Sequence, residues 1–510
     1  MDELTDLRGQ IDEIDGELIG LFNRRMAIAK KVAEVKHDAG LPVFNRKREQ
    51  EILCKIEEQT DEGIKSYAKT LFHTLFDVSR AYQSRIIAPE SLPNQFHDNG
   101  IGKYGLLGEK LGHSHSPEIH SILGNTDYQL FAVGKNDLDA FMRTRNFAGI
   151  NVTIPHKQDV TPYCDFLSGE AHAIGSVNTI VRKGNKLYGH NTDCFGLSAL
   201  IDLAGVSLNG KKVLILGSGG TSLTAQYVAK SRKAEQIIVV SRHGKNNYGN
   251  MSEQADADAI INTTPVGMYP DNGKSPIDLS VFENLSGVID VVYNPIRSAL
   301  VMDAAERGIT ALGGLAMLVN QAWKAHQLFF EGSEPLEVNA DYVYKRILEK
   351  VSNIILVGMP GSGKTTVGRL VAERLNRPFI DTDEEIVKRA GRPIPEIFAR
   401  DGEDGFRRIE SEVISDVCKE SGGVISVGGG GVMRAENRGA MRQNGIIIHL
   451  TRPVEMLRTE GRPLSKSIED LREMLGVRAP VYGGMCDFAV DNTASVGQAV
   501  DDIIRRLDEQ

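Results

Sequence analysis

The chain has 510 residues, of which 41% are hydrophobic and 25% are charged, a composition typical of globular proteins. Lys and Arg total 59 against 68 Asp and Glu, and the net charge of −9 argues against nucleic acid or an anionic membrane as the main partner. The five cysteines lie far apart and never form a C-x-x-C pair, so neither a disulfide framework nor a zinc site is supported. The first residues are acidic and no run of 18 apolar residues occurs, so we expect a cytoplasmic protein. A chain of this length predicts about three domains.

Residues 1–88 are expected to form an all-α domain. Apolar residues recur at alternating spacings of three and four from Leu4 to Val35, which predicts one long helix with a heptad seam. Arg25 falls on a seam position, where a buried guanidinium is costly unless an anion or an acidic side chain meets it. An inter-helix salt bridge and an anion site are both consistent with the seam alone.

The spacing of basic residues on this helix favours a dimer. With a rise of about 1.5 Å per residue, Arg25 and Lys36 are about 16 Å apart, close enough for long side chains to converge on one dianion. Arg8 and Lys36 are about 42 Å apart. All three can share a site only if Arg8 comes from a second chain, so we expect a homodimer through the N-terminal helical domain.

Two further helical stretches are predicted, one from about residue 45 and one over about 64–87, and the whole segment resembles the all-helical chorismate mutase family. The resemblance implies rearrangement of chorismate to prephenate by preorganised charge, without a nucleophile or a metal. It makes Lys36 and Gln83 the catalytic residues, which stabilise the ether oxygen as its bond breaks. The substrate-binding residues that it implies are Arg8, Arg25, Arg48, Glu49 and Ser79. Asn45 stands where some family members have an aspartate.

A polar stretch rich in proline and glycine, residues 89–101, is predicted to be a linker. After it, residues 102–350 contain four polar clusters, H-S-H-S-P, N-V-T-I-P-H-K, G-S-V-N-T and G-H-N-T-D, most of them at the ends of predicted strands. Each cluster alone is typical of a turn. Four of them in one α/β unit, with a lysine and an aspartate available for proton transfer, indicate a catalytic site.

A dinucleotide-binding pattern follows. The apolar run Val213 to Leu216 and the letters G-S-G-G-T-S predict a strand, a glycine turn and a helix, with Ser222 in place of the third small residue of the usual pattern. The next predicted strand, Ile237 to Val240, ends in S-R-H-G-K and not in an acid. Arg242, helped by Lys245, suits a ribose 2′-phosphate, so we expect the cofactor to be NADP(H).

These motifs, together with N-T-T-P-V-G-M, D-V-V-Y-N-P and G-L-A-M-L-V-N-Q-A further on, resemble the shikimate dehydrogenase family. The resemblance implies NADPH-dependent reduction of 3-dehydroshikimate, with Lys157 and Asp193 as the catalytic pair and Lys157 as the proton donor. Its substrate subdomain would cover about 102–205 plus the C-terminal helices, and its Rossmann NADP subdomain about 206–312. The implied substrate ligands are Ser114, Ser116, Thr153, Asn178 and Gln321. The implied cofactor ligands are Gly217, Gly219, Gly220, Ser241, Arg242, Lys245, Thr263, Tyr293, Gly314 and Met317. Leu223 stands where the family usually has an arginine.

Residues 351–510 open with a strand, a phosphate-binding loop and a helix, predicted from the letters I-I-L-V-G-M-P-G-S-G-K-T-T. Backbone N–H groups of the loop turn toward phosphate oxygens, Lys364 adds a point charge, and the Thr365 hydroxyl can ligate Mg²⁺. Further on, Asp381 and Asp383 are expected to point the same way from an extended strand end, with a helix cap as the alternative for Asp383. Pro395 lies within an otherwise helical pattern.

Three separated arginines and a glycine run in this segment fit an anionic acceptor, and the set resembles the shikimate kinase family. The resemblance implies phosphorylation of shikimate by ATP. It assigns catalysis to Asp383 as the base, to Lys364 and to the lid residue Arg462, with Mg²⁺ on Thr365 and Asp381. The implied substrate ligands are Arg407, Gly429 and Arg478. The implied nucleotide ligands are Gly358, Gly361, Ser362, Gly363, Lys364, Thr365, Thr366 and Arg458.

The three resemblances fall on one metabolic sequence, since shikimate is the product of the second activity and the substrate of the third. The sequence therefore predicts a trifunctional enzyme of aromatic amino acid biosynthesis that acts on small molecules, with an all-α mutase domain, a two-subdomain α/β dehydrogenase and an α/β kinase. Two alternatives stay open. The helical domain could be a regulatory or dimerising module, which would leave a bifunctional dehydrogenase and kinase, or the middle domain could use quinate or NAD.

Overall fold

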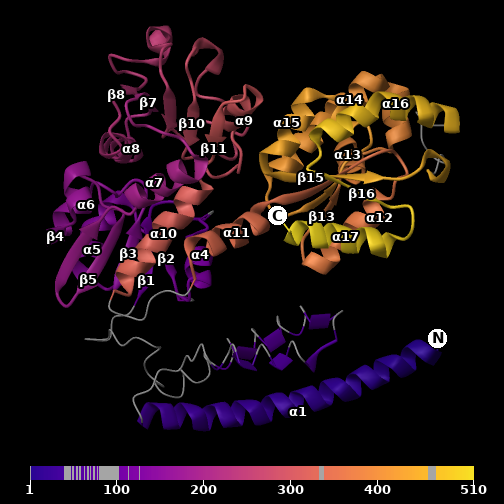
Figure 1. Ribbon diagram of the computed structural model, residues 1–510, viewed down its shortest axis with the longest axis horizontal. Helices are drawn as coiled ribbons and strands as arrows, with labels where there is room; N and C mark the ends of the chain where they lie inside the picture. The colour runs from indigo at the N-terminus through magenta and orange to yellow at the C-terminus, as the bar shows by residue number, and fades with distance from the viewer. Residues whose placement is uncertain are drawn as a thin grey trace. The chain divides into compact units, whose positions relative to one another are not determined.

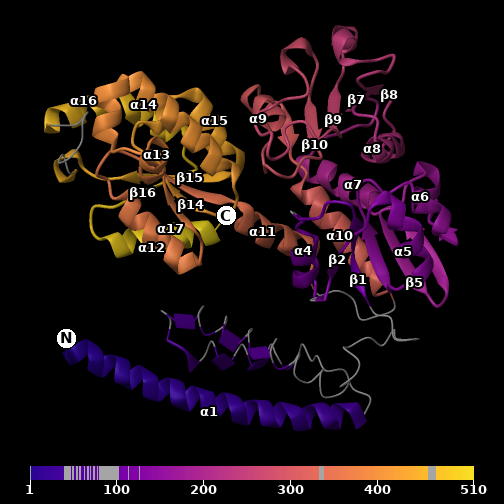
Figure 2. The same ribbon diagram turned by 180° about the vertical axis from the view of Figure 1, so that it is seen from behind.

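The chain forms two compact units, Met1–Gly102 and Lys103–Gln510, in a computed structural model (Figures 1 and 2). The residues that it describes are 2–38, scattered positions between 48 and 79, 103–112, 114–125, 127–331, 338–457 and 467–509. The predicted linker over 89–101 and four residues with predicted roles lie outside them: Glu49, Gln83, Arg458 and Arg462.

The first unit is built on one long helix, α1 (Asp2–Asp38), as the heptad pattern predicts. Its apolar seam is exposed in this unit, at Ile14, Leu18, Leu21, Ile28, Val32 and Val35. In contrast, Ala29 and Ala33 are buried, so a different stripe of α1 packs against its own chain. A continuous apolar row along a helix is unstable in water unless another surface covers it.

The second unit begins with a six-stranded mixed sheet in the order β2-β1-β3-β5-β6-β4. Strand β5 runs antiparallel to both β3 and β6, whereas the other neighbours are parallel. Its elements are β1 (Tyr104–Gly108), α4 (Ser116–Ile122), β2 (Gln129–Ala132), η2 (Lys135–Asp137), α5 (Leu138–Thr144), β3 (Gly149–Val152), η3 (Thr161–Tyr163), β4 (Phe166–Leu167), α6 (Gly169–Ile174), β5 (Thr179–Lys183) and β6 (Lys186–His190).

A second sheet of this unit is fully parallel, in the order β11-β10-β9-β7-β8. Its inner strands are continuous apolar runs because helices and loops cover both faces. The elements are α7 (Asp193–Ala204), β7 (Lys212–Leu216), α8 (Gly220–Ser231), β8 (Gln236–Val240), η4 (Tyr248–Gln254), β9 (Ala259–Asn262), η5 (Leu279–Val281), β10 (Gly287–Asp290), α9 (Ala299–Glu306) and β11 (Thr310–Leu312). Helix α10 (Leu315–Phe329) then packs along α7, and α11 (Ala340–Val351) leads to the third sheet (Figure 1).

The third sheet is also fully parallel, in the order β13-β14-β12-β15-β16. Helices α12 and α17 pack together on one face, and α14, α15 and α16 pack on the other (Figures 1 and 2). The elements are β12 (Asn353–Val357), α12 (Lys364–Leu375), β13 (Phe379–Asp381), α13 (Thr382–Ala390), α14 (Ile394–Lys419), β14 (Val424–Ser426), η6 (Gly431–Met433), α15 (Ala435–Asn444), β15 (Gly445–Thr451), η7 (Val454–Met456), α16 (Ile468–Met485), β16 (Phe488–Asp491) and α17 (Val496–Asp508).

Pro395 lies within a helix, as its sequence pattern indicates, and occupies the first turn of α14, where a proline costs no hydrogen bond. A break in α14 comes at Gly402, whose φ of 68° takes the chain through the left-handed region. One local expectation needs correction. Asp383 does not extend from a strand end beside Asp381: the strand ends at Asp381, which caps α13, and Asp383 lies in the first helical turn.

No helix among the described residues is long and apolar enough to cross a membrane.

The contact between β3 and α10 gives a test of this packing. A methyl group at Gly149 would collide with the Phe329 ring. We expect Gly149→Ala to destabilise the unit by about 1–3 kcal/mol, because an overpacked core forces strained rotamers. The single tryptophan of the chain, Trp323, lies in α10, so its fluorescence during urea unfolding reports this region.

Gly169→Ala at the start of α6 is the matched control, because an added methyl group meets nothing within 4 Å there. An unchanged urea midpoint for Gly149→Ala would contradict the packing described.

Candidate active sites

A buried lysine and aspartate form the centre of the first site. Lys157 Nζ lies 2.5 Å from Asp193 Oδ2, and both side chains are largely excluded from solvent. Asn178 Nδ2 donates to the other carboxylate oxygen of Asp193 at 2.9 Å and lies 3.5 Å from Gln321 Oε1. These side chains come from the loop after β3, the start of β5, the first turn of α7 and the middle of α10. An ion pair with a further donor in such a place can hold and pass a proton at a substrate oxygen.

Hydroxyl groups lie before α4 and after β3. Ser114 Oγ donates to Ser116 Oγ at 3.1 Å and accepts from the Ser116 backbone N–H at 3.2 Å. Thr153 follows the last residue of β3 directly. His115, between the two serines, packs edge-on against the Tyr293 ring, with centroids 6.1 Å apart. Tyr293 is one of the predicted cofactor ligands, so this contact joins the serine loop to the second sheet of the unit.

The glycine turn after β7 fits a dinucleotide phosphate. Gly217 has a φ of 107°, and a Cβ atom on it would meet Thr263 Oγ1, so only glycine fits there. Gly219 is the N-cap residue of α8 and supplies no side-chain cap, which leaves the N–H groups of the first turn for an anion. Thr263 donates from its hydroxyl to the Leu216 carbonyl at 2.6 Å and fixes the turn. These residues would hold the pyrophosphate of a dinucleotide.

The loop at the end of β8 contains the residues predicted to bind a ribose 2′-phosphate. Arg242 and Lys245 are both exposed in the loop after β8. The Ser241 backbone N–H donates to the Asn246 carbonyl at 3.1 Å and closes this loop. Both cations are therefore accessible to a 2′-phosphate.

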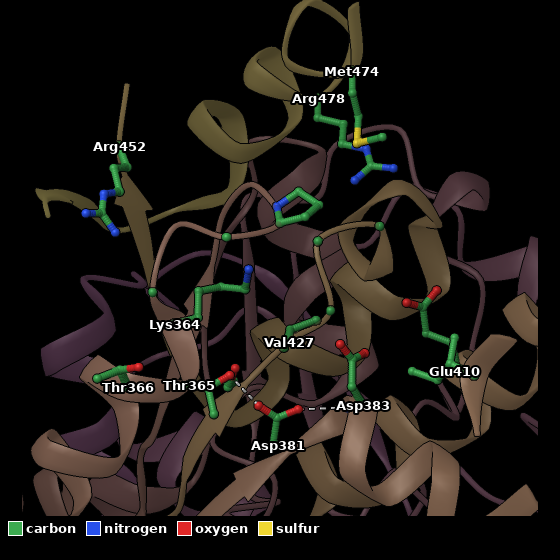
Figure 3. Close-up of a pocket in the computed structure, with 18 of the residues that line it drawn as sticks. Lys364, Thr365, Thr366, Asp381, Asp383, Glu410, Val427, Arg452, Met474 and Arg478 are labelled. Atoms are coloured by element: carbon green, nitrogen blue, oxygen red, sulfur yellow. Dashed lines mark hydrogen bonds between the residues drawn. The ribbon is translucent and has the colours of Figure 1, made fainter. Parts of the chain in front are cut away.

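The phosphate-binding loop after β12 lies in a cavity of about 700 Å³ (Figure 3). Gly358, Gly361 and Gly363 all have positive φ, which turns successive backbone N–H groups inward. Lys364 is almost fully buried, and its ammonium donates to the carbonyls of Gly358 and Met359 at 2.9 and 3.0 Å. Gly363 at the N-cap of α12 again supplies no side-chain cap.

Hard oxygen ligands for a divalent cation lie beside the loop. Thr365 Oγ1 donates to Asp381 Oδ2 at 2.7 Å, and Asp381 Oδ1 accepts from the Asp383 backbone N–H at 2.9 Å (Figure 3). A hydroxyl and a carboxylate next to a phosphate loop are the ligands that Mg²⁺ takes when it binds mainly through a nucleotide. Thr365 and Asp381 therefore fit Mg²⁺, which would neutralise phosphate charge there.

Cations gather on the opposite wall of the cavity, which Arg407 and Arg478 line. Arg407 donates to Glu410 at 2.7 Å and to Glu403 at 3.2 Å. Burial opposes the charge on Arg407, but the two glutamates outweigh it and raise the pKa of the guanidinium. Burial likewise raises the pKa of Glu410, although Arg407 opposes that shift.

The glycine run at this wall is fixed from α16. The Tyr482 hydroxyl donates to the Gly429 carbonyl at 2.6 Å, and burial raises the pKa of Tyr482 to about 12, so the phenol keeps its proton. Asp383 and Glu410 flank the same run (Figure 3). Arg407, Arg478, Asp383 and Glu410 thus line one cavity together with the phosphate-binding loop.

Glu410, Arg452 and Asn492 are polar residues of the cavity that were not predicted. Glu410 could have been found from its helical i, i+3 spacing to Arg407, which places the two on one face. Arg452 follows β15 and lines the cavity, and Asn492 donates to the Ser362 carbonyl at 2.8 Å. Asn492 is 130 positions from Ser362 and follows a different strand, so no local pattern indicates it.

In the first unit, the structure brings together some of the predicted mutase residues. Arg25 is half-buried and donates to the Leu75 carbonyl at 3.1 Å and to Ser79 Oγ, whereas Arg8 is exposed. Lys36 is half-buried and lines a shallow groove of about 230 Å³ with Ile28 and Val32. Exposed Arg48 forms an ion pair with Glu51 at 3.3 Å. Arg25 therefore faces a neighbouring helical segment of its own chain, and a carbonyl and a hydroxyl meet its charge.

Comparisons with known proteins match each of the three segments. Family models match for chorismate mutase type II over residues 7–84, for the shikimate dehydrogenase substrate binding domain over 106–180 and for shikimate kinase over 360–508. A shikimate dehydrogenase (NADP(+)) of Clostridium perfringens is 37% identical over 247 residues, which cover 44% of this chain and 91% of that protein. The enzyme of the same name from Bacillus subtilis is 34% identical over 259 residues, with 46% and 92% covered.

Among solved structures, a chorismate mutase/shikimate 5-dehydrogenase fusion protein from Clostridium acetobutylicum is 33% identical. The match covers 49% of this chain and 98% of that one, with a TM-score of 0.46.

The hydrogen bond from Asn492 to the phosphate loop can be tested by substitution. We expect Asn492→Leu to weaken binding of a nucleoside triphosphate by about 1–3 kcal/mol, roughly 5- to 150-fold, because the Ser362 carbonyl loses its buried donor and the loop loosens. Titration with a fluorescent ATP analogue measures the effect. The adjacent Thr493→Ala removes an exposed hydroxyl that contacts Asp491 and should leave affinity unchanged. Equal affinities for both variants would show that Asn492 does not support the loop.

Proposed function

This chain belongs to the shikimate dehydrogenase family, and we propose that it is a trifunctional enzyme of the shikimate pathway. It rearranges chorismate to prephenate, reduces 3-dehydroshikimate to shikimate with NADPH, and phosphorylates shikimate to shikimate 3-phosphate with ATP and Mg²⁺. The observation that carries the proposal is that the dehydrogenase and kinase segments each contain a built polar site: the Lys157 and Asp193 pair, and the phosphate loop facing Arg407 and Arg478. We assign the activities to residues 1–88, 102–350 and 351–510.

In the dehydrogenase, Lys157 gives the proton that the substrate oxygen receives as the C3 carbonyl becomes a hydroxyl. Bound NADPH supplies the hydride. Asp193 directs Lys157, because its Oδ2 atom lies 2.5 Å from Nζ and forms a charge-assisted hydrogen bond in a largely buried place. Asn178 and Gln321 bind ring hydroxyls beside this pair, and Ser114, Ser116 and Thr153 complete the substrate site. Arg242 and Lys245 select NADP(H) over NAD(H).

In the kinase, the acceptor shikimate lies between Arg407, Arg478 and Asp383, which flank the Gly429 run. The two arginines hold its carboxylate through charge-assisted hydrogen bonds, and Asp383 accepts the proton of the attacking hydroxyl. Lys364 and the loop N–H groups neutralise phosphate charge at the phosphate-binding loop. Arg458 and Arg462 are assigned to the nucleotide and the lid from their sequence motif.

In the mutase, we propose a homodimer in which a second copy covers the exposed seam of α1. The seam runs from Ile14 to Val35, which is too long an apolar row to face water. Arg8 is exposed, and the helix geometry places it far from Lys36 on the same chain, so Arg8 completes the partner's site. Arg25, Arg48, Glu49 and Ser79 would bind chorismate with it, and Lys36 and Gln83 would stabilise the ether oxygen.

The assay that tests the proposal follows three signals on the purified full chain: loss of NADPH with 3-dehydroshikimate, formation of shikimate 3-phosphate with Mg-ATP, and consumption of chorismate. We expect Lys157→Ala, Lys364→Ala and Lys36→Ala each to reduce one signal at least 100-fold and to leave the other two near wild type, because each site is built from its own segment. Each variant thereby serves as the folding control for the other two.

An inactive mutase in the wild-type chain, with the other two signals present, would leave the helical domain a regulatory or dimerising module. A variant that removes two signals together would contradict the assignment of separate sites.

The dimer makes a separate prediction. Ile28→Glu combined with Val35→Glu puts charges on the exposed seam, so we expect a monomer by light scattering and a roughly 10- to 100-fold loss of mutase kcat/KM, because the charge-assisted hydrogen bonds of Arg8 are lost. Dehydrogenase and kinase rates should not change. Lys30→Glu, on the same helix but off the seam, is the control for added negative charge. A monomer with full mutase activity would contradict the shared site.

A further inference from the structure

A buried hydrogen-bond network extends from the catalytic pair into the interior of the substrate subdomain. It contains His120 of α4, Tyr128, Asn151 of β3, and Thr179 and Asn178 at the start of β5, all of which are buried, and it ends on Asp193. His120 and Tyr128 touch none of the predicted substrate or cofactor ligands through a described hydrogen bond. His120 and Tyr128 were not among the predicted site residues. Several polar groups are nevertheless buried here, where an apolar core would not need them.

The outer end of the network has two donors on one oxygen. Tyr128 Oη lies 2.7 Å from Asn151 Oδ1, and His120 Nε2 lies 3.1 Å from the same atom. The His120 and Tyr128 rings stack with centroids 4.0 Å apart. From Asn151 the path continues through Nδ2, which donates to Thr179 Oγ1 at 3.1 Å. Asn151 and Thr179 are direct cross-strand partners, so the sheet register fixes this step.

The tautomer of His120 determines the direction of the hydrogen bonds at the outer end of this path. Its Nδ1 atom is buried without a hydrogen-bond partner among the described residues. If Nδ1 carried the proton, a buried N–H donor would be unsatisfied, which costs more than an unsatisfied lone pair. The proton therefore sits on Nε2, His120 donates, and the Asn151 amide must present its oxygen to His120 and its nitrogen to Thr179. Burial lowers the pKa of His120 to about 3, so the ring stays neutral.

The same direction continues to the catalytic aspartate. Because Thr179 accepts from Asn151, its own proton goes to Asn178 Oδ1 at 3.2 Å or to Thr192 Oγ1 at 3.1 Å. Asn178 Oδ1 also accepts from the Thr192 backbone N–H at 2.7 Å. The amide of Asn178 is thereby fixed with its nitrogen toward Asp193 Oδ1, at 2.9 Å. A reversed amide would set its oxygen against the carboxylate.

We propose that His120, with Tyr128, is a positioning residue for the dehydrogenase: it fixes the Asn151 amide, which donates to Thr179, and so supports the buried network in which Asn178 donates to Asp193 beside Lys157. The inference rests on the dehydrogenase function proposed above. It assigns to the interior face of α4 a role in catalysis that acts through Asn151, Thr179 and Asn178 and not through contact with the substrate.

The test uses the full chain and near-isosteric substitutions. Thr179→Val removes the hydroxyl in the middle of the network and keeps the shape of the side chain. We expect kcat for 3-dehydroshikimate reduction to fall 10- to 100-fold, the KM for NADPH to stay within twofold, and Thr179→Ser to recover kcat to within threefold of wild type. At the outer end, His120→Leu should lower kcat at least 10-fold, and His120→Gln, whose amide can donate to Asn151, should recover most of it. Tyr128→Phe leaves His120 as the remaining donor to Asn151 Oδ1, so its kcat should lie between those of His120→Leu and the wild type.

Kinase activity in the same preparation and the urea midpoint of Trp323 fluorescence report folding. The proposal is overturned if Thr179→Val keeps kcat within twofold of wild type. It is also overturned if Thr179→Val and Thr179→Ser lose kcat equally and their urea midpoints fall in parallel, because Thr179 would then act through packing alone. Absence of NADPH oxidation by the wild-type chain would instead contradict the proposed function itself, so the two failures are distinguishable.

Discussion

A chain with a net negative charge can bind anionic substrates only where positive potential is concentrated locally. In residues 103–510, the proposed phosphate sites lie at the carboxyl ends of parallel strands. Strand β7 lies between β8 and β9, and β12 lies between β14 and β15, so the connections leave each of them in opposite directions and open a crevice at its carboxyl end. The glycine turns begin at those points, with Gly217 and Gly358 directly after the strands. Helices α8 and α12 then start without side-chain caps, which leaves their N–H groups for phosphate oxygens. The negative net charge of the chain has little effect on phosphate binding at these turns, because the oriented N–H donors act on the phosphate at short distance.

This constraint also explains which parts of the fold could be read from the sequence. A parallel strand buried on both faces is a continuous apolar run, and a phosphate turn needs glycine, so the segments around β7, β8 and β12 carry strong local patterns. The described strands agree closely with those predictions. Asp383 was misjudged for a related reason: a residue next to a helix start looks the same in sequence whether it ends the strand, caps the helix or enters its first turn.

Interactions between segments that lie far apart in the sequence are not marked by a local sequence pattern, so they were not predicted. Asn492 supports the phosphate loop from the far end of the domain, and Tyr482 fixes Gly429 from across the cavity. For the first unit, the heptad pattern predicted the extent of α1, but not that its seam would be exposed while Ala29 and Ala33 turn inward. Periodicity locates an apolar stripe and says nothing about which partner covers it. The proposed second copy of the chain would cover this seam, which the described residues of the unit leave exposed.

The buried network shows how the substrate subdomain uses polar groups that its core does not need for stability. Ser116 and His120 are four residues apart on α4, so they lie on the same face of that helix, and one rigid element presents both a proposed substrate ligand and the residue that orients the network. Among the described residues of this network, His120 Nδ1 is a buried atom without a hydrogen-bond partner, and this makes the tautomer with the proton on Nε2 the less costly one. The Thr192 backbone N–H fixes the Asn178 amide at the inner end of the network, and His120 fixes the Asn151 amide at the outer end. A leucine at position 120 could not orient the Asn151 amide, which gives a physical reason for a buried histidine there.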